Sequence, residues 1–213
     1  MSVWLVLAPE RDDDENLTRS AWVAQQTMAR APHPPNALLA GKATRTEFAR
    51  HVATTPGLEG IAFFGHGADD RLFDADRPPK STGPSMLDAE NAHLLSGCWV
   101  HAFACLSGRT LGQHAVDRGA SIYVGYRRPL DVGWRIPPPA EPAFADLVSC
   151  ITLALLDGER DERTLRQRVS KAVDGFYDAF DRAVPDTHAV PGSMWLPVLA
   201  QQLVDEMVVV IPG

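Results

Sequence analysis

The sequence predicts one α/β domain over residues 1–213, with a mostly parallel sheet covered by helices on both faces. The first observation is an alternation along the chain, in which short apolar runs of strand length precede segments with apolar residues at helical spacing. The second is size, because 213 residues with 45% hydrophobic side chains can close one sizeable core. The third is that reactive side chains follow two apolar runs directly, at the strand ends where parallel sheets carry their sites.

Short buried strands are expected where turn residues bound an apolar run. The run Ile61 to Phe64 leads straight into Gly65-His66-Gly67, where two glycines permit a sharp turn. The run Cys98 to Ala104 leads into Cys105-Leu106-Ser107-Gly108. The other expected strands are 3–7, 37–39 and 121–126.

Helices are expected where apolar residues recur every three or four positions, as they do from Leu17 to Met28 before a run of prolines. Thr44 with Glu47, and Thr110 with Gln113, have the spacing of capping boxes, so each threonine side chain is expected to open a helix. Further helices are expected over 89–95, 144–155 and 165–180; residues 194–211 fit a helix or a strand, and 68–88 and 127–142 are expected to be irregular.

Composition limits the partners and the compartment. The formal charge of −7 provides no global positive field, so nucleic acid is not expected as a partner. Three cysteines without the dense pattern of a disulfide-stapled domain indicate a reducing compartment, and we expect a cytoplasmic protein. The N-terminal apolar run is too short for a signal peptide, and the longest apolar stretch, Leu147 to Leu156, is too short to cross a bilayer, so no membrane partner is expected.

His66 and Cys105 form the candidate site. Both follow apolar strands and have glycines close by in the sequence, at 65 and 67 for His66 and at 108 for Cys105, whereas the other histidines and cysteines lack this context. A neighbouring imidazole can take the proton of a thiol and later protonate a leaving amine. The backbone N–H groups of Gly67 and Cys105 are the expected donors to the oxyanion of acyl transfer. Taken singly, the histidine fits an ordinary turn residue and the cysteine a small buried hydrophobe, but together they favour catalysis.

These residues resemble the caspase-like, or clan CD, cysteine peptidases, in which one apolar strand ends in a His-Gly pair and another in the catalytic cysteine. The corresponding segments here are FFGHG and HAFACLSG. The continuation LGQHAVDRGASIYVGY is similar to the bacterial CHAT branch. The resemblance implies a caspase-hemoglobinase-like fold, His66 as base, Cys105 as nucleophile and no cofactor. Phe103 and Leu106 stand where metacaspase-like relatives have Asp and His, which argues against a calcium-dependent metacaspase.

The resemblance also gives expectations for substrate binding. Gly133-Trp134-Arg135 is similar to the Ser-Trp-Arg of caspases, whose arginine receives an acidic residue of the substrate. Asp131 in the same loop, or Asp69 and Asp70 after His66, would instead attract a basic residue, as in arginine- or lysine-directed relatives. For Asp69 and Asp70 a role as solvated loop charges is preferred. Asp131, Trp134 and Arg135 are the candidate substrate-binding residues.

Three alternatives remain beside the peptidase. A class I glutamine amidotransferase-like hydrolase also carries a cysteine on a strand-to-helix turn, but its later His-x-Glu pair is absent from this sequence. A zinc site from Cys98, His101 and Cys105 is disfavoured, because strand alternation sends Cys98 to the opposite face. A catalytically silent interaction module of the same fold is the third.

The expected function is that of a cysteine endopeptidase that cleaves protein or peptide substrates through a thioester acyl-enzyme. A role in bacterial regulated proteolysis or defence follows from the resemblance alone. We also expect control by a regulatory protein partner, by assembly or by cleavage within the loop 68–88.

Overall fold

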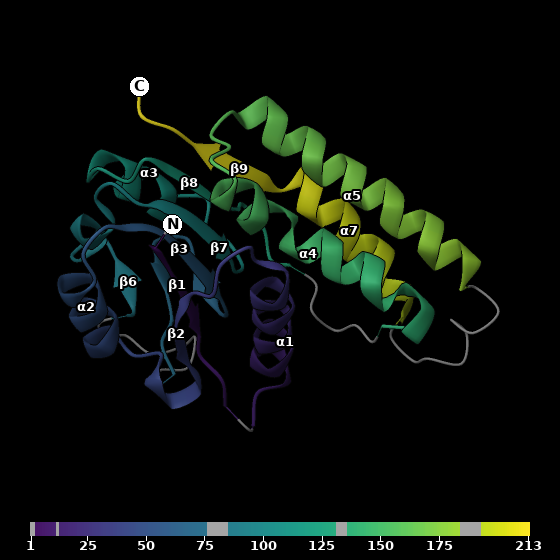
Figure 1. The fold of residues 1–213 in the computed structure, drawn as a ribbon, viewed down its shortest axis with the longest axis horizontal. Coiled ribbons are helices and arrows are strands. Elements are labelled where there is room, and N and C mark those ends of the chain that lie inside the picture. The colour runs from purple at the N-terminus through teal and green to yellow at the C-terminus, as the bar shows by residue number, and fades with distance from the viewer. Residues whose placement is uncertain (1–2, 12, 76–84, 131–135, 184–192) are drawn as a thin grey trace.

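The computed structural model describes residues 3–11, 13–75, 85–130, 136–183 and 193–213. In this part of the chain, six strands form the main sheet in the order β2-β1-β3-β7-β8-β9 (Figure 1). The first five are parallel to their neighbours, and only β9 runs antiparallel to β8. The predicted mostly parallel sheet is therefore confirmed. The strands are β1 (Val3–Ala8), β2 (Asn36–Leu39), β3 (Leu58–Phe64), β7 (Trp99–Phe103), β8 (Ile122–Tyr126) and β9 (Met207–Val210).

Helices cover both faces of this sheet, as the sequence predicts (Figure 1). On one face, α1 (Glu15–Arg30) and α4 (Glu141–Leu156) pack against the strands, α5 (Glu162–Arg182) packs against α4, and α7 (Leu196–Asp205) packs against α5 and β9. On the other face lie α2 (Arg45–Thr54) and α3 (Leu111–Asp117).

The side chains of β7 alternate between two hydrophobic cores. Trp99 and Phe103 enter the core beneath α1 and α4, whereas Val100 and Ala102 enter the core beneath α2 and α3. All five residues of the strand are buried, because helices cover both faces. This burial explains why the strand reads as a continuous apolar run rather than an alternating one.

The segment 68–88 contains regular structure that the sequence did not predict. Three two-residue strands, β4 (Gly67–Ala68), β5 (Arg71–Leu72) and β6 (Leu87–Asp88), form a small antiparallel sheet. Strands this short carry no readable alternation, so periodicity cannot reveal them. Their first member directly follows His66, so this sheet supports the histidine turn.

The remaining differences concern the type of secondary structure in two segments. The helix expected over 89–95 is a 3-10 turn, η2 (Ala92–Leu95), and the ambiguous segment 194–211 holds both α7 and β9 after the turn η4 (Ser193–Trp195). Two further 3-10 turns are η1 (Ala40–Lys42) and η3 (Pro138–Ala140).

The two expected capping boxes have different outcomes. Thr44 Oγ1 accepts a hydrogen bond from the backbone N–H of Glu47 at 3.3 Å, as expected. The side chain of Thr110 makes no capping bond, so that prediction is wrong. The backbone N–H groups of Thr110 and Leu111 donate instead to the carbonyl of Asp69, at 3.0 and 2.9 Å. A neighbouring loop thus supplies the acceptor that the threonine side chain was expected to provide.

One helical stretch in the described part of the chain, Pro138–Leu156, is long and apolar enough to cross a membrane by length and composition alone. The uninterrupted apolar run within it, Leu147 to Leu156, is too short by itself to predict this. In the structure the stretch is 56% buried, and its helix α4 packs against α1, α5 and β7. Burial on several sides explains its apolar composition, since helices in a protein core are hydrophobic nearly all round.

Candidate active site

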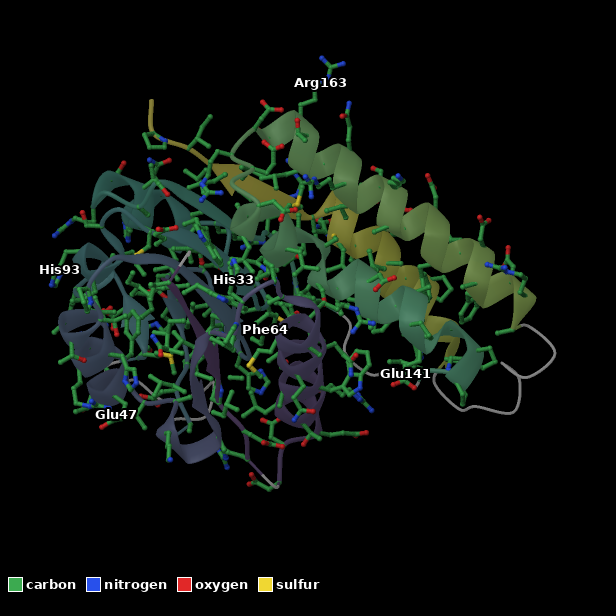
Figure 2. The ribbon with its side chains drawn as sticks, in the orientation of Figure 1. His33, Glu47, Phe64, His93, Glu141 and Arg163 are labelled. Atoms are coloured by element: carbon green, nitrogen blue, oxygen red, sulfur yellow. The ribbon has the colours of Figure 1, made fainter. Side chains whose placement is uncertain are left out.

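The site lies at the carboxyl ends of two neighbouring strands. Strands β3 and β7 pair in parallel with Phe64 opposite Phe103, and the Gly65 N–H donates to the Phe103 carbonyl at 3.2 Å. His66 and Cys105 each follow their strand by two residues, so both leave the sheet at the same edge. Figure 2 labels Phe64, the last residue of β3, in the middle of the packed side chains.

Gly67 lets the histidine turn and the cysteine turn touch. A Cβ atom added to Gly67 would lie 2.6 Å from the Cys105 carbonyl oxygen, closer than real Cβ atoms approach, and 3.0 Å from Ala104 Cβ, which is itself a tight contact. From the sequence, this glycine was expected to permit a sharp turn and to offer its N–H to an oxyanion. The structure gives a nearer reason, because the neighbouring turn itself occupies the space.

The backbone N–H of Gly67 points away from the small antiparallel sheet. Gly67 pairs with Leu72, and the hydrogen bond beside this pair runs from the Phe73 N–H to the His66 carbonyl at 3.1 Å. In an antiparallel ladder, the residues of a pair flanked in this way do not bond to each other. The Gly67 N–H is therefore not used by its partner strand.

Asp14 holds the ring of His66. The Nε2 atom of His66 lies 2.8 Å from Asp14 Oδ2, and both side chains are about four-fifths buried, with 20% and 24% of their areas exposed. The other carboxylate oxygen, Oδ1, accepts from the N–H groups of Asn16 and Leu17 and so caps α1. Burial acts to raise the pKa of Asp14, but the hydrogen bond and charge of His66, together with the two capping bonds, bring the pKa below its ordinary value.

Asp14 is the site residue that sequence reasoning missed. No carboxylate near the first strand was among the candidate residues. One signal was present, because Asp14 stands directly before an amphipathic helix, as an N-cap does, and follows the expected strand 3–7. Strand β1 is the neighbour of β3, so the loop after β1 opens at the same sheet edge as His66.

The Cys105 thiol is partly buried beside the backbone of Leu130. The Leu130 N–H donates to Sγ at 3.3 Å, and Sγ lies 3.9 Å from the Leu130 carbonyl oxygen. Burial raises the pKa of the thiol, although the N–H groups of Leu130 and of Cys105 itself act to lower it. Among the hydrogen bonds of the described residues, none joins the His66 ring to this sulfur. Catalytic hydrogen bonds are often long before substrate binds, so the two groups remain chemically compatible.

The acidic residues after His66 have arginine partners. The carboxylate of Asp69 pairs with Arg109 at 3.2 Å, and that of Asp70 pairs with Arg71 at 2.8 Å. The hydrogen bond from Arg71 lowers the pKa of Asp70. Both carboxylates are about half exposed, which fits the preferred interpretation as solvated loop charges. Asp131, Trp134 and Arg135 lie outside the described residues.

The structure separates the residues of the disfavoured zinc site. Cys98 belongs to the core beneath α2 and α3 and donates to the Leu58 carbonyl at 3.4 Å. His101 lies on the other face, with Nδ1 2.7 Å from Thr152 Oγ1, and burial lowers its pKa to about 3. No group of three or more metal-binding side chains occurs among the residues that the structure describes.

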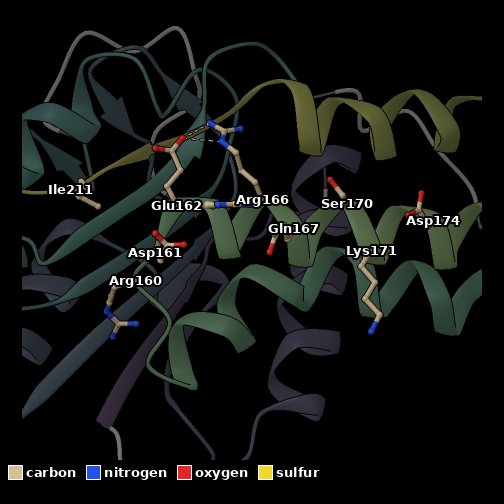
Figure 3. A pocket seen from close by; sticks show the side chains of 10 residues that line it. Arg160, Asp161, Glu162, Arg166, Gln167, Ser170, Lys171, Asp174 and Ile211 are labelled. Atoms are coloured by element: carbon tan, nitrogen blue, oxygen red, sulfur yellow. Dashed lines mark hydrogen bonds and ion pairs between the residues drawn. The ribbon is translucent and has the colours of Figure 1, made fainter.

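A wide hollow of about 780 Å³ lies elsewhere on the molecule, along α5 beside the end of β9 (Figure 3). Its side chains include Arg163 and Lys171 of α5 and the exposed Ile211. Ile211 follows Val210, which pairs with Tyr123 near the amino end of β8. The hollow is therefore at the opposite end of the sheet from Cys105.

Comparison with known proteins finds a likeness among solved structures. Neither the models of known protein families nor the curated proteins give a match to this chain. One such solved structure is that of a secreted C11 cysteine protease from Bacteroides thetaiotaomicron in complex with an irreversible peptide inhibitor. It is 12% identical over 85% of this chain, with a TM-score of 0.44. The match spans 58% of the protease, so this chain corresponds to little more than half of that protein's length.

Proposed function

We propose that this protein is a cysteine endopeptidase in which Cys105 is the nucleophile, His66 the general base and Asp14 the residue that orients the base. The observation that carries the proposal is the pairing of β3 with β7, which brings the His66 and Cys105 turns into contact at one sheet edge. Gly67, whose missing side chain permits that contact, lies between them.

The hydrogen bond to Asp14 selects the reactive nitrogen of the histidine. A carboxylate accepts hydrogen bonds, so in the neutral ring the proton is held on Nε2. The lone pair then resides on Nδ1, and this nitrogen takes the thiol proton. The same carboxylate stabilises the imidazolium that forms when the proton arrives.

The reaction then follows the steps of acyl transfer. As Nδ1 takes the proton, the sulfur attacks the peptide carbonyl carbon, and the carbonyl oxygen becomes an oxyanion facing the N–H groups of Gly67 and Cys105. The oxyanion collapses, the C–N bond breaks, and the imidazolium gives its proton to the departing amine. Water, deprotonated by Nδ1, attacks the thioester, and the released thiolate recovers the proton.

The substrates are proteins or peptides, and the biological setting is proposed from the sequence resemblance alone. We place the protein with the bacterial CHAT-type peptidases, as a cytoplasmic single-domain enzyme of regulated proteolysis or defence that a protein partner controls. Trp134 and Arg135 would bind an acidic residue before the cleaved bond, whereas Asp131 would bind a basic one.

The test uses an electrophilic peptide probe and a peptide library on the purified protein. Wild-type protein should be labelled at Cys105 and should cleave peptides, whereas Cys105→Ala should do neither. His66→Gln should lower the rate of cleavage by about 100-fold or more, since general base catalysis contributes that much. Comparing acidic with basic peptides in Arg135→Ala and Asp131→Ala variants identifies the preferred residue.

The outcomes separate the alternatives. A folded wild type that neither cleaves peptides nor reacts with the probe would support the silent interaction module. Glutamine hydrolysis that depends on Cys105, without peptide cleavage, would support the hypothesis of an amidotransferase-like hydrolase. Labelling of Cys98 or Cys150 in place of Cys105 would contradict the assignment of the nucleophile.

A further inference from the structure

We propose that Ser107 is a positioning residue of the catalytic turn, which holds the Cys105 N–H in the orientation that acyl transfer needs; the inference rests on the proposed function. Ser107 is fully buried, two residues after the nucleophile. Its hydroxyl and its carbonyl connect the turn to the end of β7 and to the neighbouring strand β8.

The hydroxyl of Ser107 joins three backbone groups. Oγ lies 2.9 Å from the Ala104 carbonyl and 3.1 Å from the Ala102 carbonyl, and these two acceptors share its single proton. The same oxygen accepts from the Tyr126 N–H at 3.3 Å. One side chain therefore ties the residues before the nucleophile to the end of β8.

The rest of the turn is fastened to the same strand. The hydroxyl of Tyr123 donates to the Ser107 carbonyl at 3.0 Å, and the Gly108 N–H donates to the Tyr126 carbonyl at 2.9 Å. A Cβ atom on Gly125 of β8 would lie 2.7 Å from Ser107 Oγ, so only a glycine at position 125 leaves room for this hydroxyl. Any side chain at position 125 would therefore displace the Ser107 hydroxyl.

This fastening is needed because the turn is strained. Leu106, between Cys105 and Ser107, has φ of 60°, in the left-handed region that non-glycine residues avoid. Such a conformation persists only where the surroundings enforce it. The Ala104 carbonyl, which Ser107 Oγ holds, belongs to the same peptide unit as the Cys105 N–H. If Ser107 lost its hydroxyl, this peptide unit would be released and could turn while Leu106 relaxes toward ordinary dihedral angles.

The test compares Ser107→Ala with a matched control. Ser149 is also a fully buried serine, hydrogen-bonded to Thr27 at 3.2 Å, but it belongs to α4. Both variants lose one buried hydroxyl, so they report the same kind of packing change. We expect Ser107→Ala to lower kcat by about 10- to 100-fold with KM changed less than about threefold, as for a weakened oxyanion donor. Ser149→Ala should keep kcat within about twofold of wild type.

Tyr123→Phe provides a second variant if Ser107→Ala does not fold. It removes only the bond to the Ser107 carbonyl, and kcat should fall by a smaller factor in the same direction. Folding of each variant is checked by thermal unfolding at the assay temperature. Equal kcat values for Ser107→Ala, Ser149→Ala and wild type would overturn the proposal.

Alkylation of Cys105 by iodoacetamide, followed by mass spectrometry of the modified peptide, tests the proposal without any peptidase activity. This reaction uses the thiolate but no oxyanion donor. Because the turned peptide would withdraw the Cys105 N–H from the sulfur, Ser107→Ala should shift the pH midpoint of alkylation upward, while the rate well above the midpoint stays within about threefold. An unchanged midpoint would contradict the proposal. If wild type cleaved no peptide but Ser107→Ala still shifted the midpoint of alkylation relative to wild type, the peptidase assignment alone would be wrong.

Discussion

Asp14 Oδ2 lies 2.8 Å from His66 Nε2, although 52 residues separate the two side chains in the sequence. The contact forms because β1 and β3 are neighbours in the sheet, so the loops that follow them meet at one edge. Asp14 thereby serves two structures at once, with one oxygen on the amino end of α1 and the other on the histidine ring.

The two roles of Asp14 can be separated by substitution. Asparagine is an equally good N-cap, so Asp14→Asn should keep the cap of α1 while it removes the negative charge from His66. Cleavage should fall by about 100-fold or more, because an amide no longer enforces the tautomer or stabilises the imidazolium. Asp14→Ala should lose the same activity and about 1 kcal/mol of stability. Full activity in Asp14→Asn would show that the carboxylate only caps the helix.

Substitution of Gly67 tests the contact between the two catalytic turns. Gly67→Ala places a methyl group against the Cys105 carbonyl, so the turns must separate. We expect a loss of about 1–3 kcal/mol in the free energy of unfolding, as for overpacking, and a large fall in probe labelling. Gly41→Ala is the control, since a Cβ atom there has no neighbour within 4 Å. Chemical denaturation and labelling of both variants give the comparison, and equal behaviour would contradict the close contact.

Buried His101 should make the protein sensitive to acid. Burial lowers its folded-state pKa to about 3 from an ordinary value of 6.5, so between these values the unfolded chain binds a proton that the native state does not. The stability present above pH 6.5 is therefore lost as pH falls toward 3, by at most about 1.4 kcal/mol per pH unit. Urea denaturation from pH 7 to 4 should show a steeper loss for wild type than for His101→Asn, which retains a polar group near Thr152. Parallel curves for the two proteins would contradict this assignment.

The two threonines with capping-box spacing should differ in their contribution to stability. Thr44 caps α2 with its side chain, so Thr44→Ala should lower the free energy of unfolding by about 1 kcal/mol. Thr110→Ala should cost less than about 0.5 kcal/mol, because the Asp69 carbonyl already receives the N–H groups of that helix start. Denaturation of the two variants under the same conditions checks the difference. Equal losses would mean that the Thr110 hydroxyl contributes in a way that the structure does not show.

Local patterns predicted the elements that carry the site. The apolar runs before His66 and Cys105 became β3 and β7 because buried parallel strands must be apolar on both faces, and each reactive residue follows its strand by two residues. Thr44 Oγ1 likewise accepts from a backbone N–H only three residues away, that of Glu47, which is within reach of a local pattern. The small sheet β4-β5-β6 escaped prediction because its two-residue strands are stabilised by pairing rather than by periodic burial.

The sequence by itself determined that two reactive residues follow apolar strands, and it located the five parallel strands of the main sheet and the helices α1 to α5. Only the tertiary structure decided that Asp14 reaches His66, that Leu130 contacts the Cys105 sulfur, and that Asp69 replaces Thr110 as a helix cap. The physical reason is that the spacing of apolar residues along the chain reflects which side chains are buried, and this pattern is local. Contacts between loops depend instead on the order of the strands in the sheet. Backbone hydrogen bonds can pair strands of any composition, so the sequence of a strand does not reveal its neighbours.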